Sequence, residues 1–284
     1  LMVAKAISPA PSYWTAPECL PQWHAPEAGK RLITVALIWL RILLVVCMFP
    51  AALQASPVQM AVASNFSAPM KQIAAHFERD TGFKTSLVFG STGQFYAQIR
   101  NGAPFELLLA ADAQTPGKLQ QEGLAIRGTG FTYAIGRLVL WSKKTDLVDQ
   151  GGAVLRSDRY RNIAIANPKL APYGAAAIQT LERLGLREQV TKKMVEASNI
   201  TQCFQFVDSE NVELGFVALS QVIENGQIRT GSAWVIPAHF HEPIEQVAIL
   251  LRPGQTSRPA QALLQYMQSE KARRVIESFG YESR

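Results

Sequence analysis

The chain has 284 residues, of which 28 are Lys or Arg, 22 are Asp or Glu and 48% are apolar. This apolar content excludes a disordered chain, and the presence of only one candidate apolar span excludes a polytopic membrane protein. The formal net charge of +6 is small for this length and no run of five basic residues occurs, so nucleic acid is not expected as a partner.

The first 55 residues resemble an N-terminal extension that ends in a secretory signal peptide. Lys30 and Arg31 precede an apolar stretch, and small residues follow this stretch up to Ala55. This order is typical of a cleavable signal peptide, and a permanent membrane anchor is the alternative. Arg41 interrupts the apolar stretch, which disfavours an anchor because Arg is costly near the centre of a bilayer. We therefore expect residues 1–55 to be removed on export to the periplasm or another extracytoplasmic location.

Cys203 would be the only cysteine of the exported chain, because Cys19 and Cys47 lie in the segment that is removed. The exported protein therefore cannot form an internal disulfide. Cys203 lies beside Phe204 and Phe206, and this apolar context predicts a buried, unreactive thiol.

From residue 58 onward, short apolar strands alternate with amphipathic helices. In the first half we expect strands at 58–63, 85–89 and 106–110, with helices at 66–82, 95–99 and 116–122. In the second half we expect strands at 133–141, 162–166, 213–218, 232–236 and 245–251, with helices at 175–184 and 258–279. Strands that alternate with helices predict βαβ units and sheets with parallel strands.

Four loops at the predicted strand ends are rich in hydrogen-bond donors: residues 64–65, 91–92, 171–174 and 198–201. Ligands of open α/β sheets bind beyond the carboxyl ends of the strands, where helix N-termini favour anions. The alternative is that these Ser, Thr and Asn residues are ordinary helix caps. None of the loops contains Lys or Arg, which disfavours a phosphoester enzyme.

At this point the chain resembles a known family, the periplasmic molybdate-binding proteins of ABC transporters. The resemblance covers residues 57–284 and rests on short motifs that occur in the family's order. These motifs are AVASNF (61–66), FGSTG (89–93), GAP (102–104), AAD (110–112), IANPK (165–169), APYG (171–174), LGFV (214–217) and FGY (279–281).

The resemblance implies an α/β protein with the two-lobed periplasmic-binding-protein fold of type II. Each lobe would be a mixed, mainly parallel sheet flanked by helices, with the ligand in the interlobe cleft. Lobe one would comprise residues 57–137 with 247–284, and lobe two residues 138–246. The protein would be a monomer without enzymatic activity or cofactor that captures molybdate or tungstate and delivers it to a membrane ABC permease. A binding protein for sulfate or another small oxyanion, or an anion-sensing module without transport, is the alternative.

The resemblance also implies the residues that contact the oxyanion: Ser64 or Asn65, Ser91 or Thr92, Tyr173, and Ile200. Tyr173 would act through its hydroxyl or its N–H, and Ile200 through its N–H. Molybdenum would be bound only as the oxyanion, with no protein ligand to the metal. Ala218 stands where some members of the family have a ligand tyrosine, so we expect Tyr173 to supply the phenol from another loop.

The four loops contain no Asp or Glu. Phosphate keeps a proton near neutral pH and requires an acceptor in its site, whereas a fully ionised dianion needs donors alone. The loops therefore favour molybdate, tungstate or sulfate over phosphate.

Overall fold

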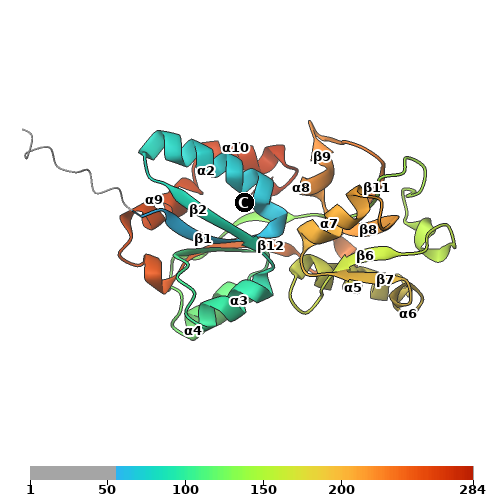
Figure 1. The fold of residues 1–284 in the computed structure, drawn as a ribbon, viewed down its shortest axis with the longest axis horizontal. Helices are drawn as coiled ribbons and strands as arrows, with labels where there is room; N and C mark the ends of the chain where they lie inside the picture. The colour runs from blue at the N-terminus through green and yellow to red at the C-terminus, as the bar shows by residue number, and fades with distance from the viewer. Residues whose placement is uncertain (1–55, 284) are drawn as a thin grey trace, which may run out of the picture. The chain divides into compact units, whose positions relative to one another are not determined.

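The computed structural model of the chain describes residues 56–283. The predicted signal peptide and its cleavage site, at residues 1–55, lie outside the described residues. Within the described part, no helix is both long and apolar enough to cross a membrane. Two large β-sheets with their own helices and a small two-stranded sheet make up this part of the chain, and we call the two large sheets with the elements around them lobe one and lobe two (Figure 1).

Lobe one is built on a six-stranded mixed sheet. Its strands, in spatial order, are β13 (Glu282–Ser283), β4 (Phe131–Gly136), β12 (Ile244–Leu250), β3 (Leu107–Ala110), β1 (Val58–Ala63) and β2 (Thr85–Gly90). The strands β2, β1 and β3 are parallel to one another, and each later pairing towards β13 is antiparallel.

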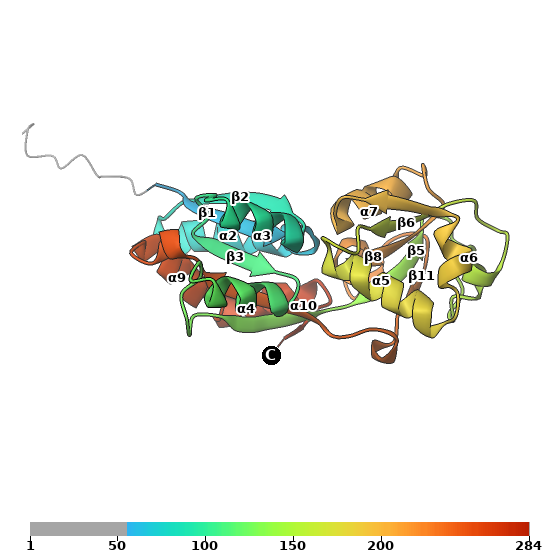
Figure 2. The same cartoon turned by 90° about the horizontal axis from the view of Figure 1, so that it is seen from below.

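Helices cover both faces of this sheet. On one face lie α2 (Ser67–Thr81), α9 (Arg258–Tyr266) and α10 (Glu270–Ser278), and on the other lie α3 (Thr92–Arg100) and α4 (Gln114–Gln121) (Figures 1 and 2). The apolar residues that predict the first helix, Phe66, Met70, Ile73 and Phe77, are all fully buried. Their spacing therefore identified the face of α2 that packs on the sheet.

Lobe two is built on a five-stranded mixed sheet in the order β11 (Ser232–Val235), β5 (Leu138–Ser142), β8 (Leu214–Ala218), β6 (Ile163–Ala166) and β7 (Met194–Ala197). Helices α5 (Pro172–Arg183) and α7 (Ile200–Asp208) pack against it from two sides (Figure 2). Its shorter elements are η2 (Ala153–Arg156), α6 (Arg187–Thr191), α8 (Leu219–Val222), β9 (Ile223–Glu224), β10 (Gln227–Ile228) and η3 (Ala238–Phe240). The predicted fold of two mixed sheets flanked by helices is confirmed. The prediction that these sheets are mainly parallel is wrong, because three of the five pairings in the first sheet and two of the four in the second are antiparallel.

The chain passes between the lobes twice. The predicted single strand 133–141 is wrong, because β4 ends at Gly136 in lobe one and β5 begins at Leu138 in lobe two. The chain returns when β12 enters the first sheet at Ile244. The lobe boundaries at 137/138 and 246/247 remain a proposal.

Two other predictions of elements are corrected by the structure, and two of its elements had no counterpart in the prediction. The terminal helix 258–279 is two helices, because the Ser269 side chain accepts a hydrogen bond of 3.2 Å from the Ala272 N–H and so begins α10. Most of the predicted loop 171–174 belongs to α5, which begins at Pro172 with Ala171 as its N-cap. Strand β7 and helix α7 were not predicted.

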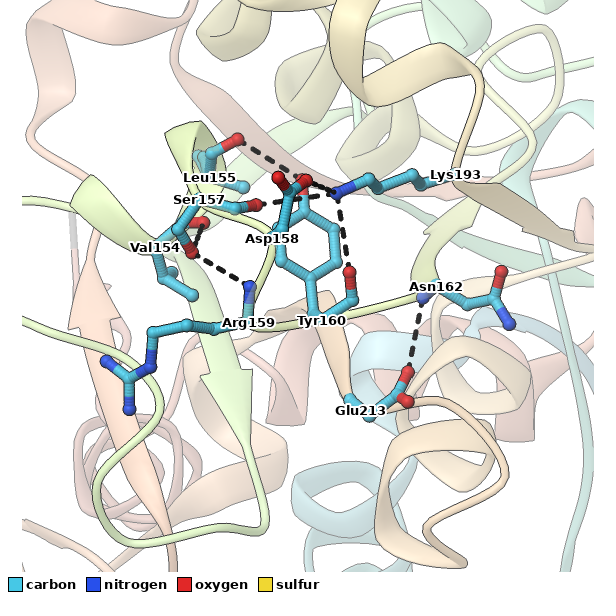
Figure 3. A network of polar contacts seen from close by, with 9 residues as sticks. All are labelled: Val154, Leu155, Ser157, Asp158, Arg159, Tyr160, Asn162, Lys193 and Glu213. Carbon is cyan, nitrogen blue, oxygen red and sulfur yellow. Dashed lines mark hydrogen bonds and ion pairs between the residues drawn. The ribbon is translucent and has the colours of Figure 1, made fainter.

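A polar network in lobe two fixes the loop that leads into β6 (Figure 3). Lys193 donates to the backbone oxygens of Ser157 and Tyr160, both at 3.4 Å, and pairs with Asp158 at 3.2 Å. Its ammonium group also lies 4.4 Å from the centre of the Tyr160 ring. This network ties the loop to the chain just before β7.

Candidate functional site

The four donor-rich loops meet at one small cavity between the lobes, with a volume of about 10 Å³. All six residues that the family resemblance singles out line this cavity: Ser64, Asn65, Ser91, Thr92, Tyr173 and Ile200. Each of them is buried, with at most 4% of its surface exposed. The remaining lining residues are Ala63, Gly90, Ala111, Ala171 and Pro172.

Lobe one presents two helix starts to the cavity. The 3-10 turn η1 (Ser64–Phe66) follows β1 and leads into α2, while α3 begins at Thr92. The first N–H groups of a helix have no acceptor within it, so the N–H groups of Asn65 and Thr92 are available to a ligand.

The hydroxyl groups of Ser91 and Thr92 differ in their hydrogen-bond partners. The Thr92 hydroxyl oxygen accepts from the Ala111 N–H at 3.0 Å, and the Ser91 N–H donates to the Gln94 side chain at 3.2 Å. The buried Ser91 hydroxyl has no hydrogen-bond partner among the described residues. The Ser91 hydroxyl is therefore wholly free for a ligand, whereas the Thr92 hydroxyl is fixed in place as an acceptor and keeps only its proton to donate.

The Asn65 side chain is directed away from ligand binding by its own partners. Its Nδ2 donates to Gln246 Oε1 at 2.8 Å and to the Tyr281 hydroxyl at 2.9 Å. Both amide hydrogens are thereby used, which leaves the Asn65 backbone N–H and the Ser64 hydroxyl as the donors of this turn. Sequence reasoning missed Gln246, and it noted Tyr281 only within the terminal FGY motif.

Lobe two supplies the first turns of α5 and α7. Pro172 opens α5, and Gly174 lets this turn approach β6, because a side-chain carbon at Gly174 would collide with the Ala166 carbonyl oxygen. At the start of α7, the Asn199 side chain accepts from the N–H groups of residues 201 and 202, each at 3.0 Å. The Ile200 N–H is therefore left for a ligand.

Tyr173 offers two donors to its surroundings. Its N–H belongs to the first turn of α5, while its buried hydroxyl has no hydrogen-bond partner among the described residues. The hydroxyl lies against the backbone of Gly136, where any side-chain carbon would collide with it. Burial, and then the nearby Tyr281, hold the pKa of Tyr173 well above its usual value, so the phenol stays protonated. Both roles predicted for Tyr173, through the N–H and through the hydroxyl, stay open.

The cavity is electrically neutral in its side chains. None of its lining residues in the described part of the chain is charged. The nearest carboxyl along the chain, that of Asp112, lines a neighbouring groove and accepts from the Thr115 N–H at 2.6 Å. Within residues 56–283, no group of three or more His, Cys, Asp or Glu side chains is placed to hold a metal ion. The arrangement suits a small anion held by N–H and O–H donors.

Hydrogen bonds join the two lobes around the cavity. The Thr201 hydroxyl donates to the Ser64 carbonyl at 3.1 Å, and the Ser220 hydroxyl donates to the Asn65 carbonyl at 2.9 Å. The Gly93 N–H donates to the carbonyl of residue 170 at 2.8 Å. The lobes are thus closed on each other at this point.

Residues 58–282 match the family model of the bacterial extracellular solute-binding proteins. The chain belongs to this family. Membership confirms the prediction of a binding protein and not an enzyme.

Individual members of the family are closely similar to the chain. It is 54% identical over 230 residues to the molybdate-binding protein ModA of Azotobacter vinelandii, and the matched region spans 81% of this chain and 91% of that protein. The ModA protein of Rhodobacter capsulatus is 45% identical over 232 residues, or 82% of this chain and 90% of that protein. The solved periplasmic molybdate-binding protein of Azotobacter vinelandii superposes with a TM-score of 0.76 at 41% identity, covering 80% of this chain and 99% of that chain. The family resemblance and the fold class predicted from the sequence are therefore confirmed.

Proposed function

We propose that this extracellular solute-binding protein captures molybdate, and also tungstate, in the periplasm as a monomer and delivers it to a membrane ABC permease. The observation that carries the proposal is the neutral, donor-lined cavity at which all six predicted residues meet. The identity of 54% with a molybdate-binding relative supports the choice of ligand. A cleavable signal peptide within residues 1–55 would direct the export.

The proposed contacts divide between hydroxyls and backbone N–H groups. Ser64 and Ser91 donate through their hydroxyls, and Asn65 and Thr92 through their N–H groups. Lobe two contributes the N–H of Ile200 and the N–H or hydroxyl of Tyr173. Both hydrogens of the Asn65 amide already have partners, and the Thr92 hydroxyl is oriented by the Ala111 N–H, which its oxygen accepts.

Six donors of this kind are sufficient to hold a dianion without a cation. A hydrogen bond to a charged group contributes roughly 1.5–3 kcal/mol, and all of these donors lie in a buried site, where they offset the loss of hydration. Phosphate is disfavoured because its remaining proton would find no carboxylate among the residues that line the cavity. Sulfate has the same charge and shape as molybdate, so only the size of the cavity can separate the two.

A thermal-shift screen of the purified protein with molybdate, tungstate, sulfate, phosphate and chromate tests the proposal. We expect molybdate and tungstate to raise the melting temperature most. A larger shift with sulfate would assign the protein to the sulfate alternative, and no shift with any of the five anions would refute an oxyanion site.

Calorimetric titration of variants tests the proposed contacts. Ser64→Ala and Ser91→Ala should each weaken molybdate binding about ten- to a hundred-fold, the equivalent of one hydrogen bond to a charge. The exposed Ser209 provides the matched control, since Ser209→Ala should leave binding unchanged. Tyr173→Phe decides between the two roles of Tyr173: a similar loss identifies the hydroxyl, and unchanged affinity identifies the N–H.

A further inference from the structure

Tyr281 is a buried residue behind the cavity, between α10 and the short C-terminal strand β13. Its hydroxyl accepts from Asn65 Nδ2 at 2.9 Å and donates to the Asn65 backbone oxygen at 2.8 Å. One hydroxyl near the end of the chain therefore holds both the side chain and the backbone of Asn65. Tyr281 itself does not line the cavity.

Two further residues complete this arrangement around Asn65. Ser220, from lobe two, donates to the Asn65 backbone oxygen at 2.9 Å and lies 3.1 Å from the Tyr281 hydroxyl. Gln246, from β12, accepts from the Asn65 amide at 2.8 Å and is fully buried. The register between β12 and β4 shifts at Gln246, which is typical of a β-bulge and marks this point of the strand that links the lobes.

These contacts connect the orientation of the Ser64–Phe66 turn to the closure of the lobes. The Asn65 N–H can point into the cavity only while the peptide groups around it keep their orientation. The Asn65 carbonyl is held by Tyr281 within lobe one and by Ser220 across the cleft. Tyr281 and Ser220 share the same acceptor, so the effects of removing either hydroxyl should be coupled.

We propose that Tyr281 is the positioning residue of the anion site. It orients Asn65 for the ligand and, together with Ser220, stabilises the closed arrangement of the lobes. The identity of the anion rests on the proposed function, whereas the positioning role concerns the protein with or without ligand.

Tyr133 provides a matched control for Tyr281. Both tyrosines are buried in lobe one and both pack on Phe66. The centre of the Phe66 ring lies 4.8 Å from the ring centre of Tyr133 and 5.4 Å from that of Tyr281. The Tyr133 hydroxyl, however, has no hydrogen-bond partner among the described residues. The change to Phe is therefore the same at both positions, but only at position 281 does it remove a group that holds Asn65.

Molybdate binding by Tyr281→Phe, Tyr133→Phe, Ser220→Ala and the double variant Tyr281→Phe with Ser220→Ala provides the first test. Tyr281→Phe leaves the Asn65 amide and carbonyl without this partner, so it should weaken binding roughly five- to a hundred-fold, and Tyr133→Phe should change it less than about two-fold. The double variant should lose less affinity than the product of the two single losses. Equal affinity of Tyr281→Phe and Tyr133→Phe, or fully multiplicative losses, would overturn the proposal.

Hydrogen exchange in the ligand-free protein provides a second test that does not depend on the anion. Tyr281→Phe should accelerate exchange of the backbone amides in the Ser64–Phe66 turn, and Tyr133→Phe should not. Unchanged exchange in Tyr281→Phe would overturn the positioning role even if the protein binds molybdate. Accelerated exchange, in a protein that binds no oxyanion, would support the positioning role and refute the proposed function alone.

Discussion

At Gly93, the single methyl group that a change to alanine adds should keep the lobes from closing fully. It lies in the first turn of α3, and its N–H donates across the cleft to the Leu170 carbonyl at 2.8 Å. A side-chain carbon at Gly93 would lie 2.9 Å from Leu170 Cα and 3.0 Å from its carbonyl oxygen. Unstrained carbon contacts lie at about 3.5–4.0 Å, and backbone atoms cannot rotate away, so the lobes would have to separate by roughly half an ångström or more.

The expected magnitude follows from that separation. The hydrogen bond between the lobes would lengthen or break, at about 0.5–1.5 kcal/mol, and donors on opposite sides of the cavity would no longer reach the anion together. We expect Gly93→Ala to weaken molybdate binding about ten- to a hundred-fold, which corresponds to roughly 1.4–2.8 kcal/mol. The folding of lobe one should not suffer, because Ala is favoured over Gly in a helix by about 1 kcal/mol.

Gly117 in α4 offers the matched control, because a side-chain carbon there would meet no atom within 4 Å. Calorimetry with molybdate and urea unfolding without ligand should be measured for Gly93→Ala and Gly117→Ala. We expect a loss of affinity for Gly93→Ala alone and no loss of ligand-free stability for either variant. If both variants bind molybdate equally well, the close approach of α3 to Leu170 is not required for binding and the reasoning is refuted.

Three further variants test the roles of side chains outside the cavity. Cys203 is fully buried and its thiol donates to the Phe216 carbonyl at 3.1 Å. Cys203→Ala should therefore lower the free energy of unfolding by about 1–2 kcal/mol and leave molybdate affinity within a few-fold, and loss of binding in a folded variant would contradict this. Burial raises the pKa of Asp112, so the folded chain holds this proton to higher pH than the unfolded chain and stability falls as pH rises through that interval. Asp112→Asn keeps an acceptor for the Thr115 N–H and should flatten this fall in urea midpoints measured from about pH 4 upward; an unchanged pH dependence would count against it. Lys193→Met should lower the free energy of unfolding by about 1 kcal/mol, mostly through the lost contact with the Tyr160 ring, because the ion pair with the exposed Asp158 contributes little. Calorimetry should show unchanged molybdate affinity.

The elements of the first lobe were the most predictable from the sequence. The predicted strand 58–63 matches β1 in full, and the predicted helix end near Gly82 matches the left-handed cap of α2. These signals are local: residues of alternating burial or helical spacing lie close together in the chain. A glycine with positive φ is likewise a local helix stop.

The errors arose where the outcome depends on distant partners. Residues 133–141 are apolar except at Gly136 and Arg137, and this short interruption alone does not indicate that the chain changes sheets at Arg137. The two parts pair with different neighbours, β4 with β12 and β5 with β8. Helix α7 was missed because the loop 198–201 was considered as a set of donors, although Asn199 is a strong N-cap for a helix that begins at Ile200.

The residues that line the cavity could be singled out from the sequence, but the hydrogen bonds of their side chains could not. Donor-rich loops at helix starts suggest an anion site, the family resemblance adds the six residues, and the structure brings all six to one cavity. Whether Asn65 or Ser64 uses its side chain depends on Gln246 and Tyr281, which lie 181 and 216 residues from Asn65 in the chain. Such partners leave no local pattern in a single sequence.

The distribution of these partners bears on how a site without cations can hold a dianion. Ser64 and Asn65 face the cavity, while their carbonyl oxygens accept hydrogen bonds from Thr201 and Ser220 of lobe two. A peptide group whose carbonyl accepts a hydrogen bond is polarised, which strengthens the donor at its other end. The Ser64 carbonyl and the Asn65 N–H belong to one peptide group, so the hydrogen bond from Thr201 strengthens the Asn65 N–H as a donor. Closure of the lobes therefore fixes the geometry of the cavity and also increases the donor strength of the Asn65 N–H. Because these neutral donors are in place only when the lobes are closed, the affinity for an anion depends on closure. An anion that is too large or too small for the closed arrangement of the lobes loses several hydrogen bonds at once.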